Sequence, residues 1–274
     1  MKVSVVSILF AVASTPFVLA QSDESFEVEK RTQLQQRAPI AFVMDCAGSN
    51  GKKGAGETCN TACYGVNCKF HTNTYDFDAP TDKTKSTRRK RAGCTNGKGK
   101  NKNPCKSNRS GNSCDEFPFA STKDADTKQQ FYRCVPGTDN QSQGGQLGNL
   151  AKNICNNHAC QFTLGFKGEA NYQYCRKNPS CTNDGNLWTK GNKPLRRDLL
   201  ADDEVDIQPR STGGYYKLRS GETFYSPSDL EIGSRAFHYA RNETIDAELE
   251  TRDMDDEEYW GARQLIEDEI VEKM

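Results

Sequence analysis

Hydrophobic residues are concentrated at the start of the chain, where residues 3–19 form an apolar run. The run contains a proline and is under twenty residues long, so it is a poor membrane anchor. It ends in Val-Leu-Ala, which is typical of signal-peptidase cleavage. The pattern predicts a signal peptide over residues 1–20 and a secreted, extracellular protein. The polar residues 21–37 end near basic residues and predict a propeptide or a disordered leader.

Residues 38–194 carry apolar positions with two different periods. Segments that alternate like a strand contain Tyr75, Phe77, Phe131 and Tyr132. Such residues are typical of a sheet core, and a base-stacking surface is the alternative. Apolar residues between positions 147 and 154 have helical spacing, which predicts a helix over residues 141–155.

Residues 195–274 differ from the rest of the chain in composition, because they contain no cysteine and are strongly acidic. A partial apolar stripe predicts a helix over residues 244–273. The members of this stripe are Tyr259, Trp260, Leu265, Ile266 and Ile270. A stripe among so many acids suits docking better than independent folding. We therefore expect an acidic C-terminal extension that is partly helical or disordered.

All twelve cysteines lie between Cys46 and Cys181, which marks residues 38–194 as a separate domain. An even number of cysteines in an exported chain predicts up to six disulfides, whose connectivity the sequence does not give. Zinc binding by closely spaced cysteines is the alternative, but an oxidising compartment favours disulfides. A bridge between Cys114 and Cys134 would brace the polar segment between them.

Two adjacent carboxylates, Asp115 and Glu116, follow a cysteine in the segment CDEFPFAST. On an extended strand their side chains point to opposite faces, so a single site can use both only at a bend. Pro118 makes a bend plausible, because it disfavours helical backbone at the residue before it and cannot donate to a sheet ladder.

A second polar group lies about twenty-five residues later, in the segment DNQSQGGQL. Asp139, Asn140 and Gln143 would lie on the first turn of the predicted helix. Carboxylate and amide oxygens are hard ligands, suited to Mg²⁺ or Mn²⁺ rather than to zinc. The alternative is that this group only caps the helix and that the two carboxylates belong to a solvated turn.

These two segments, with Arg133 and a Val-Pro pair between them, resemble the NucA/NucB family of secreted deoxyribonucleases. The cysteine-containing approach to the first segment resembles the eukaryotic, fungal branch of the family. The resemblance covers roughly residues 40–190. It implies an α+β fold, in which a small disulfide-rich domain is related to the ββα-metal nucleases.

The resemblance also implies a metal-dependent, sequence-nonspecific endonuclease that hydrolyses DNA, and RNA is open as a further substrate. Asp115 and Glu116 are the catalytic candidates, with Asp115 as the base that activates water. Glu116 is also a candidate metal contact, together with Asp139, Asn140 and Gln143. Asp139 departs from the family pattern, because many relatives have the longer Glu there. The expected cofactor is Mg²⁺ or Mn²⁺.

The net charge of the whole chain is zero because two regions of opposite net charge cancel. Residues 38–194 contain 23 Lys/Arg against 12 Asp/Glu, whereas residues 195–274 contain 10 against 21. Much of the positive charge falls in residues 83–109, which we expect to be a loop that binds DNA phosphates. Solubility and a processing site are the alternatives. The expected nucleic-acid contacts are Arg88, Arg89, Lys90, Arg91, Lys98, Lys100, Lys102 and Arg133.

The function, the histidines and the glycosylation sequons each have an alternative interpretation. A catalytically inactive disulfide-rich binding module or toxin component is the alternative function. His71 and His158 lie outside both segments and are expected to be ordinary surface or packed residues. Glycosylation sequons begin at Asn108, Asn140 and Asn242, and a glycan on Asn140 would obstruct the proposed site.

The opposite charges of the two halves suggest a further role for residues 198–274. We expect this region to inhibit the nuclease within the same chain until cleavage after Arg197 releases it, because a tethered polyanion has a high effective concentration. A disordered solubilising tail, a released peptide and a partner-binding segment are the alternatives.

Overall fold

A seven-stranded sheet forms the largest part of the computed structural model, with the spatial order β1-β12-β13-β10-β11-β7-β4. Its strands are β1 (Ile40–Asp45), β4 (Thr74–Phe77), β7 (Cys160–Lys167), β10 (Gly214–Leu218), β11 (Thr223–Ser226), β12 (Arg235–Tyr239) and β13 (Leu265–Lys273). The structure describes residues 40–49, 52–94, 103–195, 212–239 and 254–274, all within one unit. The predicted signal peptide and leader lie outside these residues.

The sheet closes on itself through β1. This strand pairs in parallel with β12 on one edge and with β7 on the other, and antiparallel ladders connect the remaining strands. Phe42 and Met44 therefore join the main core, whereas Ala41 and Val43 join a second cluster with residues of β10 to β13. Burial on both faces explains why β1 is an unbroken apolar run.

The C-terminal region does not form the helix predicted over residues 244–273. It contains the short helix α7 (Asp256–Ala262) and the strand β13, while residues 240–253 lie outside the described part. β13 pairs with β10 on one edge and β12 on the other, and Ile270 is fully buried. Strand pairing outweighs the weak helical stripe. The pairing of β1 with β12 and of β7 with β11 joins residues on both sides of the boundary predicted between residues 194 and 195.

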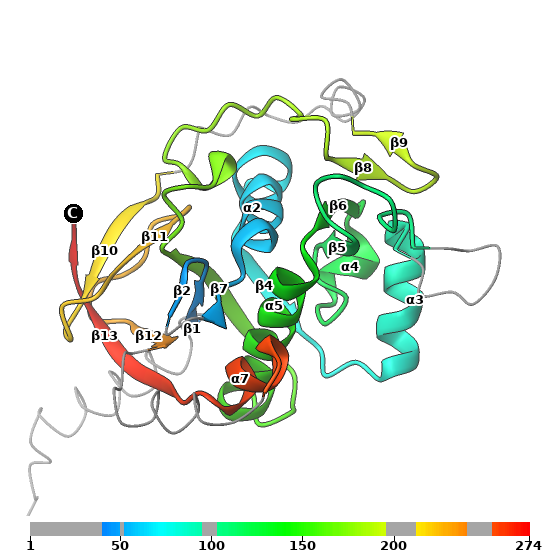
Figure 1. Cartoon of the computed structure of the whole chain (residues 1–274). Coiled ribbons are helices and arrows are strands. Elements are labelled where there is room, and N and C mark those ends of the chain that lie inside the picture. The colour runs from blue at the N-terminus through cyan, green and yellow to red at the C-terminus, as the bar shows by residue number, and fades with distance from the viewer. Residues whose placement is uncertain (1–39, 50–51, 95–102, 196–211, 240–253) are drawn as a thin grey trace, which may run out of the picture. The chain divides into compact units, whose positions relative to one another are not determined.

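A separate four-stranded sheet carries the candidate site. Its strands are β5 (Ser113–Phe117), β6 (Phe131–Val135), β8 (Trp188–Thr189) and β9 (Lys193–Pro194), and a small hairpin is formed by β2 (Gly48–Ser49) and β3 (Lys52–Lys53). The helices are α2 (Gly56–Tyr64), α3 (Asp82–Ala92), α4 (Asp124–Thr127), α5 (Gly137–Asn149), the π-helices η1 (Gly65–Phe70) and η2 (Leu150–Ile154), and the 3₁₀ helix η3 (Gln173–Cys175). Figure 1 shows α2 and α5 between the large sheet and the β5–β6 hairpin.

The basic segment begins as a helix, not as the predicted loop. α3 starts after Thr81, whose hydroxyl oxygen accepts a hydrogen bond from the backbone N–H of Thr84. It ends at Gly93, which adopts the left-handed conformation that favours glycine at a helix end. Residues 95–102 lie outside the described part, so Lys98, Lys100 and Lys102 cannot be placed.

All twelve cysteines form disulfides, as the cysteine count predicts. The pairs are Cys46–Cys59, Cys63–Cys175, Cys68–Cys181, Cys94–Cys114, Cys105–Cys134 and Cys155–Cys160. The suggested Cys114–Cys134 bridge is wrong. These residues face each other across β5 and β6, where the backbone ladder already joins the strands. Their disulfides instead tie each strand to the segment that precedes the hairpin.

The aromatic residues with strand spacing are core residues, as predicted. Tyr75, Phe77, Phe131 and Tyr132 are all buried. They lie in two clusters, because Tyr132 packs with cysteines beside the hairpin while the other three belong to the main core. In the described part of the chain, no helix has the length and apolar character that crossing a membrane requires.

Candidate active site

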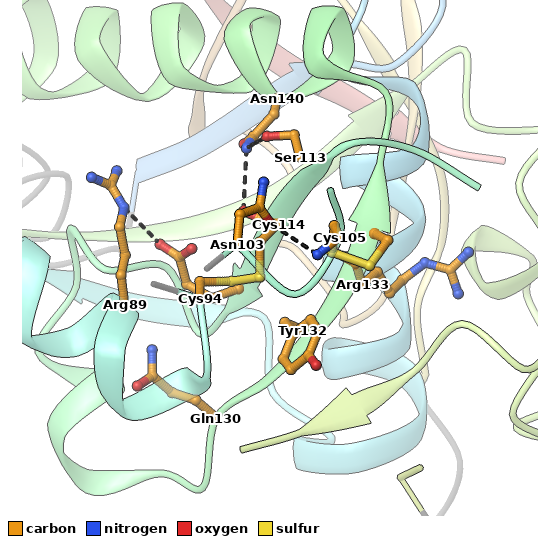
Figure 2. The surroundings of a disulfide bond; sticks show 12 residues. Arg89, Cys94, Asn103, Cys105, Ser113, Cys114, Gln130, Tyr132, Arg133 and Asn140 are labelled. Carbon is orange, nitrogen blue, oxygen red and sulfur yellow. Dashed lines mark hydrogen bonds and ion pairs between the residues drawn. A yellow bond between two sulfur atoms is a disulfide. The ribbon is translucent and has the colours of Figure 1, made fainter. Parts of the chain in front are cut away.

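The β5–β6 hairpin places Asp115 and Glu116 on opposite faces, as their adjacency in a strand predicts. Asp115 lies opposite Arg133 in the ladder, and Glu116 lies opposite Tyr132. Figure 2 shows Arg133 and Arg89 extending to different sides of the hairpin. The two carboxylates therefore have different neighbours and must be considered separately.

Glu116 lines a cleft of about 820 Å³ between α3, the hairpin and α5. Its carboxylate oxygen Oε1 accepts a hydrogen bond of 3.3 Å from Nε of Arg89. Burial raises the pKa of Glu116, and the nearby Arg89 charge opposes this rise. Among the described residues, the polar side chains that share the cleft include Lys85, Arg89, Asn103, Asn112, Asn140, Gln141, Gln143 and Glu257.

Asp115 lies behind the cleft and is only 2% exposed. Thr61 of α2 and Gln143 of α5 are its neighbours, and within the described part of the chain its Oδ2 atom has no hydrogen-bond partner. Burial raises the pKa of Asp115 well above its usual range, and the charge of Glu116 adds to the rise. Gln143 also lines the cleft, so it separates Asp115 from the open space.

Asn140 connects the start of α5 to the hairpin. Its Nδ2 donates hydrogen bonds to Oγ of Ser113 at 2.7 Å and to the carbonyl oxygen of Cys114 at 3.3 Å, as Figure 2 shows. Because the amide nitrogen is used in this way, the amide oxygen is the atom that Asn140 can offer to a cation in the cleft.

Asp139 is directed away from the cleft. Its Oδ2 accepts a hydrogen bond of 2.8 Å from the backbone N–H of Glu57, in the first turn of α2. Ala55, at the start of that helix, has no side chain for capping, so Asp139 supplies the cap from a distant part of the sequence. This position does not support the predicted metal contact through Asp139. The residue does cap a helix, as the alternative suggested, but the helix is α2 and not α5.

Two residues expected to bind DNA are instead buried in ion pairs. Arg88 is 2% exposed, and its NH1 and NH2 groups donate to the two carboxylate oxygens of Asp78. Arg133 is also 2% exposed and pairs with Glu57 at 2.9 Å and Asp184 at 2.8 Å. Guanidinium groups held in this way hold elements together and are not exposed to a DNA backbone.

Among the described residues, the basic side chains that reach the cleft are those of Lys85 and Arg89, one turn apart on α3. Lys85 is not among the predicted DNA contacts, although its i,i+4 spacing from Arg89 puts both side chains on one helix face. Lys90 is exposed on another face, and Arg91 pairs with Asp126 at 2.7 Å. On α3, therefore, only part of the basic surface faces the cleft.

The donors in the cleft fit a hard divalent cation. Glu116 contributes a carboxylate, and Asn140 and Gln143 contribute amide oxygens. Within the described residues, no group of three or more His, Cys, Asp or Glu side chains could hold a metal ion. A set with one carboxylate is compatible with Mg²⁺, which keeps several waters and often relies on substrate phosphates for its remaining contacts. His71 and His158 are exposed and do not line the cleft.

Replacement of Asp115 by Asn is expected to raise the melting temperature near neutral pH. Burial raises the pKa of this carboxyl in the folded state, so between the unfolded and folded pKa values the folded protein holds a proton that the unfolded chain has lost. The free energy of unfolding therefore falls as pH rises through that window. Asparagine does not ionise, so it removes the free-energy cost of the buried carboxyl. Each kcal/mol gained in the free energy of unfolding raises the melting temperature by about 2–4 °C.

Scanning calorimetry of both proteins between pH 4 and pH 8 measures this effect, and a Glu231→Gln variant is the control because Glu231 is exposed. The gain from Asp115→Asn should grow with pH, whereas the control should match the wild type. A melting temperature that falls at every pH would show that the charged form of Asp115 stabilises the fold.

Three comparisons with known proteins gave one family match. Residues 62–165 match the family model described as Deoxyribonuclease NucA/NucB. The matched segment includes the hairpin, α3 and α5, which together supply most of the cleft. Searches of curated proteins and of solved structures gave no match. The match shows that residues 62–165 of this chain are similar to the NucA/NucB nuclease family.

Proposed function

We propose that the protein is a secreted, metal-dependent and sequence-nonspecific endonuclease that hydrolyses phosphodiester bonds of DNA. The observation that carries the proposal is the position of Glu116, a buried carboxylate that lines a cleft whose facing wall is basic. The order of β5, β6 and α5 is the order that gives the ββα-metal nucleases their name. The structural relationship to those enzymes stays a prediction.

Each cleft residue has a role that follows from its position. Lys85 and Arg89 bind the phosphate backbone, which positions the DNA without reading its bases. Asp115 is the proposed base for the attacking water; because Gln143 separates it from the open cleft, the proton would reach Asp115 through one bridging water. An aspartate with an ordinary pKa is a weak base, so the rise caused by burial brings its basicity closer to neutral pH.

Glu116 and Asn140, with Gln143 beside them, are the residues that would hold Mg²⁺ or Mn²⁺. When bound, the cation polarises the scissile phosphate and stabilises charge on the leaving oxygen. The contact between Arg89 and Glu116 keeps the carboxylate oriented in the cleft and holds a positive charge close to the expected position of the phosphate.

Nicking of supercoiled plasmid by the purified protein tests the proposal. We expect nicked circles with Mg²⁺ or Mn²⁺ present, intact plasmid with EDTA, and recovery when the metal is restored. Cleavage sites spread over unrelated sequences would agree with backbone recognition. DNA binding without any cleavage under these conditions would favour the alternative, an inactive binding module.

Removing the positive charge of Lys85 and Arg89 together, by substitution with Gln, is expected to weaken DNA binding and to flatten its salt dependence. Each lost phosphate contact lowers the slope of log K against log salt by about 0.9 for duplex DNA, so the slope should fall by almost two. Fluorescence anisotropy between 50 and 200 mM salt measures it.

A Lys90→Gln variant is the matched control, because Lys90 belongs to the same helix and is exposed but does not line the cleft. Equal losses of slope in the control and in the double variant would mean that the whole helix, and not its cleft face, attracts DNA.

A further inference from the structure

The cleft that contains Glu116 has one wall that the family-matched residues 62–165 do not supply. Glu257, in the first turn of α7, lines the cleft together with Gly144, Leu147 and Gly148 of α5. The acidic C-terminal region thus contributes a carboxylate to the same space as the candidate catalytic residues. Its contribution comes from one short helix, while β10 to β13 belong to the closed sheet.

The two glycines of the DNQSQGGQL segment let α7 approach α5 closely. A Cβ atom at Gly145 would lie 2.4 Å from the carbonyl oxygen of Glu257 and 2.9 Å from Cβ of Trp260, so only glycine fits without a shift. A Cβ atom at Gly144 would lie 3.6 Å from the side-chain carboxyl carbon of Glu257. The Glu257 carboxylate is therefore held against the cleft side of α5.

α7 is also fixed by buried contacts. Trp260 is fully buried, and its Nε1 donates a 2.8 Å hydrogen bond to the carbonyl oxygen of Lys53. Asn149 of α5 donates from Nδ2 to the carbonyl oxygen of Trp260 at 3.1 Å and to that of Arg263. Because the indole anchors one side of the short helix, the backbone of Glu257 is held beside the cleft, while its side chain is exposed.

Opposite charges therefore meet in the cleft. Lys85 and Arg89 of α3 provide the cationic wall, and Glu257 provides an anionic one. Duplex DNA carries one negative charge for about every 1.7 Å of its axis, so a backbone that spans the cleft is attracted at one wall and repelled at the other.

We propose that Glu257 is a specificity-determining residue, which weakens binding of the DNA backbone at the α7 end of the cleft and thereby confines the substrate to the α3 side. This inference rests on the proposed function. Of residues 198–274, which were predicted to inhibit the nuclease, the proposal assigns an effect on DNA binding to Glu257 alone.

Charge substitutions at neighbouring positions test the inference. Glu257→Gln and Glu257→Lys are compared with Glu258→Gln and Glu258→Lys, because Glu258 lies in the same first turn and is exposed but does not line the cleft. Binding of a fluorescein-labelled duplex is measured by anisotropy in EDTA, so that cleavage does not interfere. Substitution in the same helical turn matches the effects on the helix dipole and on net charge.

We expect Glu257→Gln to bind DNA about 1.5- to 5-fold more tightly at low salt, the range of single exposed charge interactions. Glu257→Lys should bind more tightly still, with a salt slope steeper by about 0.9 for one added phosphate contact. The Glu258 variants should change affinity less than half as much on a logarithmic scale.

Equal effects at both positions would overturn the inference, because they would reflect net charge alone. Unchanged affinity in all four variants would overturn it as well, since the α7 end would then lie outside the DNA path. If the protein binds DNA and shows the Glu257 effect but cleaves nothing, the proposed function fails while the inference about binding stands.

Discussion

Asp115→Asn is expected to reduce plasmid nicking by about 10²- to 10⁴-fold, the contribution typical of a positioned proton-transfer group. Glu116→Gln is expected to reduce it by about 10²- to 10³-fold, the loss typical of removing one group that stabilises charge in the transition state. Both substitutions keep side-chain volume, and neither removes an apolar contact, so the fold should survive. The two variants should lose activity for different reasons. Glu116 lines the cleft and would hold the metal, while Asp115 lies behind Gln143 and would accept a proton.

Metal and pH titrations separate the two roles. Glu116→Gln should need a higher Mg²⁺ or Mn²⁺ concentration for its residual activity. Asp115→Asn should keep the metal requirement but lose the acidic limb of the pH–rate profile, because the base that must be deprotonated has gone. Glu231→Gln should retain full activity. Near-wild-type nicking by both variants would show that the catalytic groups lie elsewhere.

A chain that ends at Arg197 is expected not to fold. The truncation removes β10, β11, β12 and β13 from the closed sheet, and it also removes α7. Trp260, Tyr259, Tyr216, Phe224 and Ile270 are among the buried side chains lost. Full burial of one such side chain is worth about 1.5–3 kcal/mol, and the total stability of a domain is only about 5–15 kcal/mol.

Circular dichroism and thermal melting of the truncated protein measure this outcome, and we expect no cooperative transition. Addition of the 198–274 fragment during refolding should restore one, since the fragment contributes strands to the sheet. A truncated protein that melts cooperatively and nicks DNA would contradict the expectation. Truncation is therefore a poor test of inhibition by residues 198–274, which stays a prediction, and the Glu257 substitutions are a better one.

The geometry around the site could be predicted where neighbouring residues determine it. The alternation of a strand puts Asp115 and Glu116 on opposite faces, and helical spacing predicts α5, although the helix begins at Gly137 and continues as η2 after Asn149. The mixed α/β fold with six disulfides also agrees with the sequence. Each of these features depends on local geometry or on a simple count.

The features that could not be predicted depend on contacts between distant residues. Asp139 caps a helix that begins more than eighty residues earlier, and nothing in its own segment indicates this partner. Arg88 belongs to a basic run but is buried by Asp78 and Asp126. The strand β13 has acids on its exposed positions, and only its two partner strands distinguish it from a helix.

The pairing of β1 with β12 has a consequence for the order of folding. Ala41 and Ala236 are partners in this ladder, and 236 minus 41 gives a separation of 195 residues. Contacts of such long range form slowly, because the entropy of closing the intervening chain must be overcome first. Cys155–Cys160 and Cys46–Cys59 join residues close in sequence and can form much earlier. During synthesis the segments with these short-range crosslinks are complete before β13 exists. The closed sheet, and the cleft wall that α7 supplies, can therefore form only after β13 has been made.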